Sequence, residues 1–146
     1  MANNEVNQVS LQLSAGAKYT TKIQARNHEL IADEPESLDG LDQGPTPYEL
    51  LLASLGSCTA ITIRMYVDRK GWDVKGIDVQ LKHEKVPELS DEGVPMPGKF
   101  IDVFERDIQI TGDLEEKQYA RILTIADKCP VHKTLHSAVE IKTRLV

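Results

Sequence analysis

Residues 46–70, TPYELLLASLGSCTAITIRMYVDRK, decide the fold of this chain. Thr46 fits the N-cap of a helix, because Pro47 then takes the first helical position, where its missing N–H costs nothing, and Glu49 can complete a capping box. Residues 50–63 carry no charge on any face. A helix that is apolar all round is buried all round. We therefore predict a long central helix with protein on every side.

Strands are predicted on both sides of this helix along the chain. Apolar and polar residues alternate, with the period of two that strands require, over residues 9–13, 19–25, 28–32, 77–83, 100–111 and 139–145. Two stretches rich in proline and glycine, residues 33–47 and 86–99, are predicted as long loops. Capping residues predict a second helix over residues 114–127, and Cys129-Pro130 opens a short helical turn.

The order of these elements favours antiparallel sheet, because the connections rarely leave room for a parallel crossover. We therefore predict an α+β fold in a single domain over residues 1–146. One sheet covers only one face of a helix. We expect a second copy of the chain to cover the other face, so the protein is predicted to be a homodimer.

Composition excludes several classes of function. Lys plus Arg is 17 and Asp plus Glu is 23, which gives a formal net charge of −6 and argues against nucleic acid or an anionic membrane as partner. The mean hydropathy of −0.33 is too polar for a membrane-spanning protein. Residues 1–16 lack the basic start and apolar centre of a secretory signal. We expect a cytoplasmic protein whose cysteines are thiols.

The two cysteines, Cys58 and Cys129, lie 71 positions apart and form no CxxC motif, so only the fold can bring them together. Cys129 precedes a helical turn, where backbone N–H groups favour a thiolate. Cys58 lies about 18 Å along the predicted helix from Thr46, which is too far for the helix dipole to act. A reactive Cys58 therefore needs a cation nearby, and an unreactive one is a small buried apolar residue.

The segments GPTPYELLLASLGSC, residues 44–58, and DKCPVHKTL, residues 127–135, resemble the OsmC/Ohr superfamily of thiol-dependent peroxidases. Its members carry one cysteine in a central helix, after a short loop with a proline, and another in a Cys-Pro segment. The resemblance covers essentially the whole chain, because the order of elements and both cysteine segments match. It implies an OsmC-like fold, built as an intertwined homodimer with two long helices between sheets from both chains, and no cofactor.

The resemblance also implies roles for individual residues. Cys58 becomes the peroxidatic residue, which attacks the peroxide and turns into a sulfenic acid, and Cys129 becomes the resolving residue, which forms a disulfide with it. An arginine from the strand region holds the thiolate in such enzymes. Arg26 is the first candidate for that arginine. Arg106 is the second, because it shares a strand face with Ile108.

The resemblance also implies a carboxylate near the helix start that steadies this arginine. In the hydroperoxide-resistance branch a glutamate directly follows the proline, whereas here Tyr48 fills that position and Glu49 comes one later. At 100° per residue, Tyr48 lies about 80° around the helix from Cys58 and Glu49 lies on the opposite face. Glu49 is therefore a candidate for the catalytic carboxylate and equally for a capping residue. The sequence looks closer to a general OsmC-like branch.

A metal site is an alternative use of the segment that carries Cys129. Cys129, His132 and His136 have the spacing CxxHxxxH, which a metal can use. A closed zinc site needs a fourth ligand, and Cys58 is the only other thiol. We therefore predict no metal.

Two functions follow from these observations. The first is a thiol-dependent peroxidase that uses Cys58 and Cys129 on an organic hydroperoxide or hydrogen peroxide and is regenerated by an external thiol. The second is a non-catalytic homodimer that binds a small hydrophobic molecule and keeps its cysteines for packing. Loss of free thiol on addition of peroxide distinguishes the two.

Overall fold

The computed structural model describes residues 6–146. The chain divides into two compact units, an N-terminal unit, Met1–Leu51, and a C-terminal unit, Leu52–Val146. The boundary falls within the first turns of the long helix α1 (Pro47–Lys70). The single domain expected from the sequence stays a prediction, and the two units are described separately below.

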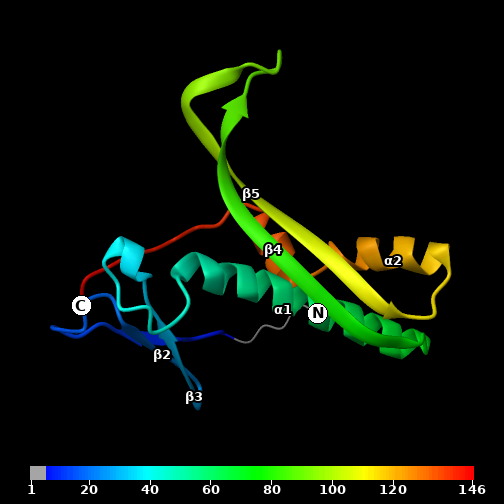
Figure 1. The fold of residues 1–146 in the computed structure, drawn as a ribbon, viewed down its shortest axis with the longest axis horizontal. Coiled ribbons are helices and arrows are strands. Elements are labelled where there is room, and N and C mark those ends of the chain that lie inside the picture. Colours follow the sequence, from blue (N-terminus) through cyan, green and yellow to red (C-terminus); the bar gives the residue numbers. More distant parts are fainter. Residues whose placement is uncertain (1–5) are drawn as a thin grey trace. The chain divides into compact units, whose positions relative to one another are not determined.

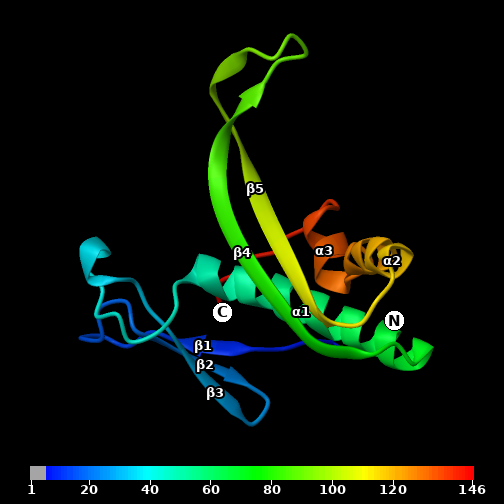
Figure 2. The same ribbon diagram turned by 45° about the vertical axis from the view of Figure 1, so that its right-hand side comes forward.

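The N-terminal unit contains an antiparallel sheet with the strand order β1-β2-β3 (Figure 2). Its strands are β1 (Ser10–Gln12), β2 (Thr21–Ala25) and β3 (His28–Ala32). In the central strand Ile23 is buried and pairs with Leu11 on one side and Leu30 on the other. The three strands predicted before the helix are therefore confirmed, although the first two are shorter than expected.

Asp33 organises the loop that follows β3, which also contains the short helix η1 (Glu36–Leu38). Its side chain is 2% exposed and accepts hydrogen bonds from the Thr20 hydroxyl at 2.8 Å and from the N–H groups of Glu34 and Gln43 at 2.8 and 3.2 Å. Burial acts to raise the pKa of Asp33, but these hydrogen bonds outweigh it and hold the pKa below its ordinary value. The Asp33 carboxylate thus links the start of the predicted loop over residues 33–47 to Gln43 and to Thr20 before β2.

The first helix begins and ends where the sequence predicts. The Glu49 N–H donates to the Thr46 hydroxyl at 3.2 Å, and the Thr46 N–H donates to the Glu49 carboxylate at 2.8 Å, which completes the capping box. At the other end Gly71 adopts a left-handed φ of 68°, and its N–H donates to the Asp68 carbonyl. Only glycine reaches this φ without a steric penalty, so the chain turns out of the helix here.

The burial of α1 is one-sided in the single chain. Its buried residues are confined to one face: Leu55, Gly56, Thr59, Ile63, Tyr66 and Val67. Ile61 and Met65 are 59% and 52% exposed. One chain thus supplies a layer for only one side of α1, and the cover expected on the other side from a second copy stays a prediction. By length and composition α1 could also cross a membrane, although core helices of soluble proteins pass the same test.

In the C-terminal unit, β4 (Val74–Leu89) and β5 (Pro95–Gly112) form a long antiparallel ribbon that runs across α1 (Figure 1). The prediction of a long loop over residues 86–99 is wrong. The strands continue to a tight turn in which the Ser90 N–H donates to the Val94 carbonyl at 2.8 Å. Each strand of a two-stranded ribbon has a free edge, where a proline removes no ladder hydrogen bond. Prolines therefore fit here although they suggested a loop.

The remaining elements are the helices α2 (Glu116–Ala126) and α3 (Pro130–Leu135). A core cluster joins α1, the start of β4 and α2, and it contains Ile63, Tyr66, Val67, Val74, Ile122, Ile125 and Ala126. The strand predicted over residues 139–145 is not formed, and Val139 and Ile141 are 59% and 84% exposed. An alternating pattern becomes a strand only where another strand is available to pair with it.

We predict that Asp33→Ala lowers the thermal midpoint by several degrees at neutral pH, because three donors lose their acceptor. Folding lowers the pKa of Asp33, so its stabilisation is present above the ordinary carboxyl pKa and is lost as the pH falls through the folded value. Thermal unfolding of both proteins between pH 7 and pH 3 should show the difference shrinking with acid. The exposed Glu29→Ala is the control, and a constant difference would contradict the assignment.

Candidate active site

The structure brings the two cysteines together within the C-terminal unit. Cys58 lies on α1 and is partly exposed, whereas Cys129 is the N-cap of α3 and is fully buried. Both are free thiols, and Cys129 is close enough to Cys58 to raise the pKa of the Cys58 thiol. The fold therefore brings together two cysteines that lie 71 positions apart in the sequence.

The surroundings of Cys58 do not favour a thiolate. Burial raises its pKa, and so does the neighbouring Cys129 through its hydrogen bond and its charge. The Val131 N–H and the Thr62 hydroxyl act in the opposite direction, because each hydrogen-bonds to the sulfur. The balance raises the pKa above the ordinary value, as the sequence predicts for a cysteine deep in an apolar helix.

Cys129 is held in place by its position at a helix start. Pro130 takes the first position of α3, and the Lys133 N–H donates to the Cys129 carbonyl at 3.1 Å. The Cys129 N–H in turn donates to the Ala126 carbonyl at 3.2 Å. The backbone of Cys129 is thus fixed to the end of α2 on one side and to α3 on the other.

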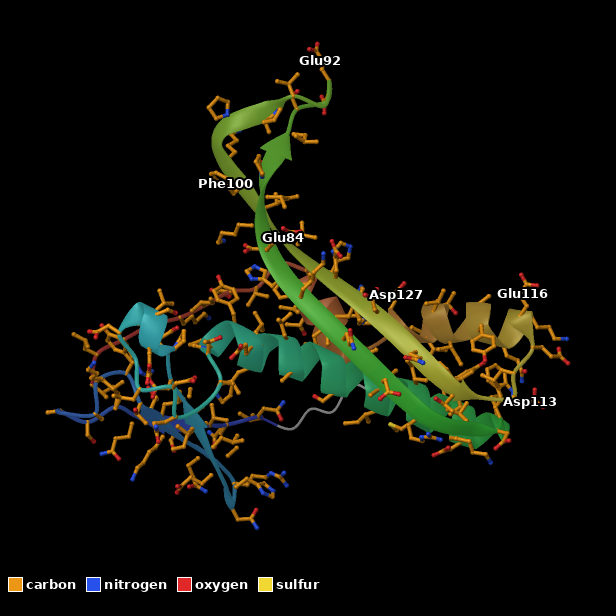
Figure 3. All side chains as sticks on the ribbon, viewed as in Figure 1. Glu84, Glu92, Phe100, Asp113, Glu116 and Asp127 are labelled. Atoms are coloured by element: carbon orange, nitrogen blue, oxygen red, sulfur yellow. The ribbon has the colours of Figure 1, made fainter. Side chains whose placement is uncertain are left out.

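Arg106 connects the two cysteine-bearing segments. Its guanidinium donates to the Thr59 hydroxyl at 2.9 Å and to the Asp127 carboxylate at 3.0 Å, with a longer bond of 3.5 Å to the Ala126 carbonyl. Only 12% of its side chain is exposed. Asp127, labelled in Figure 3, follows the last residue of α2. One end of this bridge is therefore next to Cys58 and the other is just before Cys129.

The other predicted site residues belong to the N-terminal unit. Arg26 is exposed in the tight turn between β2 and β3, where its φ of 55° is left-handed. Glu49 serves the capping box described above, so the capping reading is confirmed. Tyr48 is 49% exposed at the second position of α1. Arg26 and Glu49 therefore lie in a different unit from the two cysteines.

The histidines near Cys129 do not gather with further ligands. The His132 and His136 rings meet edge to face with their centroids 5.8 Å apart, and His132 Nδ1 lies 3.8 Å from the Asp127 carboxylate. Within residues 6–146, no group of three His, Cys, Asp or Glu side chains is placed to hold a metal ion.

A separate open pocket of about 500 Å³ lies between the end of α1 and the start of α2. Its polar side chains are already engaged. Glu115 accepts from the Gln118 backbone in a capping box and pairs with Lys117 at 3.0 Å, while Arg121 donates to the Tyr66 hydroxyl at 3.1 Å. The Arg121–Tyr66 bond joins α2 to α1, and the Glu115 bonds stay within the start of α2.

Sequence reasoning missed Thr62, Asp127 and the Val131 N–H. Thr62 was within reach of a prediction, because it follows Cys58 by one helical turn and so shares its face. Asp127 lies in the Cys-Pro segment itself, but the sequence of that segment does not indicate that Arg106 is its partner. A backbone N–H leaves no trace in the sequence at all.

The fold and site together define a class of protein. It is an α+β protein with antiparallel sheets in which a long helix carries one thiol and a later helical turn brings a second thiol to it. A family model described as OsmC-like protein matches residues 40–144, and the chain belongs to this family.

Solved structures support the same fold. An OsmC-like protein from Mycoplasma pneumoniae has 17% identity and a TM-score of 0.72, with 92% of this chain and 89% of that chain covered. An organic hydroperoxide resistance protein OsmC from Legionella pneumophila has 16% identity and a TM-score of 0.65, with 91% and 90% covered. A hypothetical protein from Aquifex aeolicus VF5 has 26% identity and a TM-score of 0.67, with 90% and 88% covered. Comparison with curated proteins finds no match.

We predict that Cys129→Ala lowers the pKa of Cys58 and that Thr62→Val raises it further, because the first change removes a group that disfavours the thiolate and the second removes one that favours it. The rate of Cys58 alkylation as a function of pH measures both shifts. Cys58→Ser identifies any signal from Cys129. Identical curves for wild type and both variants would contradict the described surroundings of Cys58.

Proposed function

We propose that the protein is a thiol-dependent peroxidase that reduces organic hydroperoxides or hydrogen peroxide through Cys58 and Cys129. The observation that carries this proposal is that a partly exposed thiol on α1 and a fully buried thiol at the start of α3 are close enough for the second to raise the pKa of the first. Two thiols this close can form a disulfide, and their different exposure separates their roles.

The first step uses the thiol that a peroxide can reach. The Cys58 thiolate attacks one oxygen of the peroxide, the O–O bond breaks, and an alcohol or water leaves, so Cys58 becomes a sulfenic acid. The Cys129 thiol then attacks the Cys58 sulfur, the S–O bond breaks, and the hydroxyl group leaves as water with the proton that the Cys129 thiol gives up. The product is a disulfide between Cys58 and Cys129.

The exposure of the two sulfurs also favours one direction of regeneration. Cys129 is 0% exposed, so an external thiol reaches the disulfide at the Cys58 sulfur. Attack there forms a mixed disulfide on Cys58 and releases Cys129 as the leaving thiolate. A second external thiol then attacks the mixed disulfide and frees Cys58. Assembly with another chain can only reduce the exposure of Cys129, so this order does not depend on the oligomeric state.

The raised pKa of Cys58 requires a cation that opposes it. We propose Arg26 for this role, because guanidinium keeps its charge when partly buried and can hold a thiolate and a peroxide oxygen at once. We propose Glu49 as the carboxylate that steadies it. One Glu49 oxygen accepts the Thr46 N–H, and a carboxylate has a second oxygen for a guanidinium.

We further propose that the protein acts as an intertwined homodimer in the cytoplasm. The exposed apolar residues of α1, Ile61 and Met65, support a partner on that face, as do Val139 and Ile141 in a segment with strand-like alternation. A second copy of the chain supplies the missing layer without requiring a different protein. We expect an apolar interface above about 2,000 Å² in total.

The peroxidase proposal predicts different outcomes for the two cysteines. Cys58→Ser should lower the rate of peroxide consumption at least a hundredfold, because no other thiol is exposed to react. Cys129→Ser should consume about one equivalent of peroxide and then stop, with one oxygen added to Cys58 by mass spectrometry. A Cys58→Ser protein that still consumes peroxide at the wild-type rate would contradict the proposal. If peroxide causes no loss of free thiol and is not consumed, a ligand-binding module with structural cysteines is favoured instead.

The dimer proposal predicts that Ile61→Asp separates the copies, because it places a charge on the exposed apolar face of α1. Sedimentation should change from a dimer to the monomer mass of 16.3 kDa. Ala120→Asp, on an exposed position of α2, is the matched control and should stay dimeric. A stable wild-type monomer at micromolar concentration would overturn the proposal. Circular dichroism checks that the variant keeps its helices.

A further inference from the structure

We infer that Arg106 is a positioning residue for disulfide formation, holding the segment that carries Cys129 against the turn of α1 that carries Cys58. The inference rests on the proposed two-cysteine chemistry and deepens it. It gives Arg106 a role distinct from activation of the thiolate, for which it was the second candidate.

The geometry of the bridge supports this role. Thr59 directly follows Cys58, is 0% exposed, and accepts from Arg106 at 2.9 Å. The Thr59 hydroxyl also donates to the Leu55 carbonyl at 2.7 Å. The group that accepts from Arg106 is therefore itself fixed to the helix backbone. The bridge therefore starts from a rigid point beside the peroxidatic sulfur.

The other end of the bridge meets the backbone that leads into Cys129. Arg106 donates to the Ala126 carbonyl and to the Asp127 carboxylate. The same Ala126 carbonyl accepts the Cys129 N–H at 3.2 Å. Arg106 and Cys129 thus share an acceptor, and loss of the guanidinium loosens the turn whose position sets that of the Cys129 sulfur.

The bonding of Arg106 favours positioning over activation. Its hydrogen bonds go to oxygen acceptors on α1 and at the end of α2. The groups that favour the Cys58 thiolate by hydrogen bonding are instead the Thr62 hydroxyl and the Val131 N–H. Arginine suits such a bridge because its planar fork places several N–H donors in fixed directions, which a lysine ammonium does not.

The consequence falls on the second chemical step. In that step the Cys129 sulfur forms a bond to the Cys58 sulfur, the S–O bond of the sulfenic acid breaks, and the hydroxyl leaves with a proton as water. Its rate depends on how often the two sulfurs are in line and in contact. The first step, attack of Cys58 on peroxide, needs no movement of the Cys129 segment. Loss of the bridge should therefore slow resolution and spare the first oxidation.

The test measures the tendency of Cys58 and Cys129 to form a disulfide without any peroxide. Full-length protein is equilibrated in glutathione redox buffers, and the fraction with the Cys58–Cys129 disulfide gives the effective concentration of one thiol at the other. Arg106→Met should lower this value roughly tenfold or more, as expected when reacting groups lose their alignment. Because peroxide is absent, the result stands even if the protein proves to have no peroxidase activity.

Two further variants and one control keep the result interpretable. Asp127→Ala removes one exposed partner of Arg106 and should give a smaller fall in the same direction. Arg106→Lys should restore part of the loss. Arg64→Met is the matched control, because Arg64 also joins α1 to another segment, through the Val74 carbonyl at 3.0 Å, but touches neither cysteine segment. It should leave the effective concentration unchanged.

Three outcomes would overturn the inference. The first is an unchanged effective concentration in a folded Arg106→Met protein. The second is an equal fall in Arg64→Met, which would indicate general loosening. The third is a slower first oxidation together with a shifted pH profile of Cys58 alkylation, which would make Arg106 an activating residue instead. If Arg106→Met does not fold, Asp127→Ala and Arg106→Lys decide the question alone.

Discussion

Close packing between α1 and the β4–β5 ribbon is the constraint on which the C-terminal unit depends. At Gly56 the two elements approach so closely that an added Cβ would lie 2.7 Å from a methyl carbon of Leu81. Arg106 is paired opposite Leu81 on the ribbon, and it reaches Thr59 on the next turn of the helix. The face of α1 that needs glycine for contact is therefore also the face that receives the buried arginine. Cys58 lies between these two contacts along the chain.

The sequence predicted the parts of this fold that depend on local chemistry. The capping box at Thr46, the glycine stop at Gly71 and the helical turn after Cys129 follow from residues within a few positions of each other. The extent of the ribbon and the fate of residues 139–145 depend on whether another strand is present to pair with, which local patterns do not reveal. The uncharged run of α1 predicts burial without showing what supplies the cover, because the cover depends on what lies outside the helix.

The candidate site likewise has one part that the sequence predicts and another part that it does not. Two cysteines in recognisable segments were predictable, and their proximity in the structure agrees with their proposed chemistry. The partners of Arg106 were not, because Thr59, Ala126 and Asp127 come from two distant segments. The proximity of the thiols also has opposing effects. The nearness of Cys129 that suits it for disulfide formation also makes the Cys58 thiolate harder to form.

The ribbon has a further consequence for how the site is assembled during folding. Its pairs run from Val74 with Gly112 to Leu89 with Pro95, so the ribbon can close progressively from its turn through contacts that are local at first. Figure 3 places Glu92 and Phe100 at that far end, well away from α2. Because side chains alternate between faces, a slip of one residue in this register would turn Arg106 away from Thr59 and bring Glu105 or Asp107 into its place. A turn remote from both cysteines thus sets which charge reaches the helix beside Cys58.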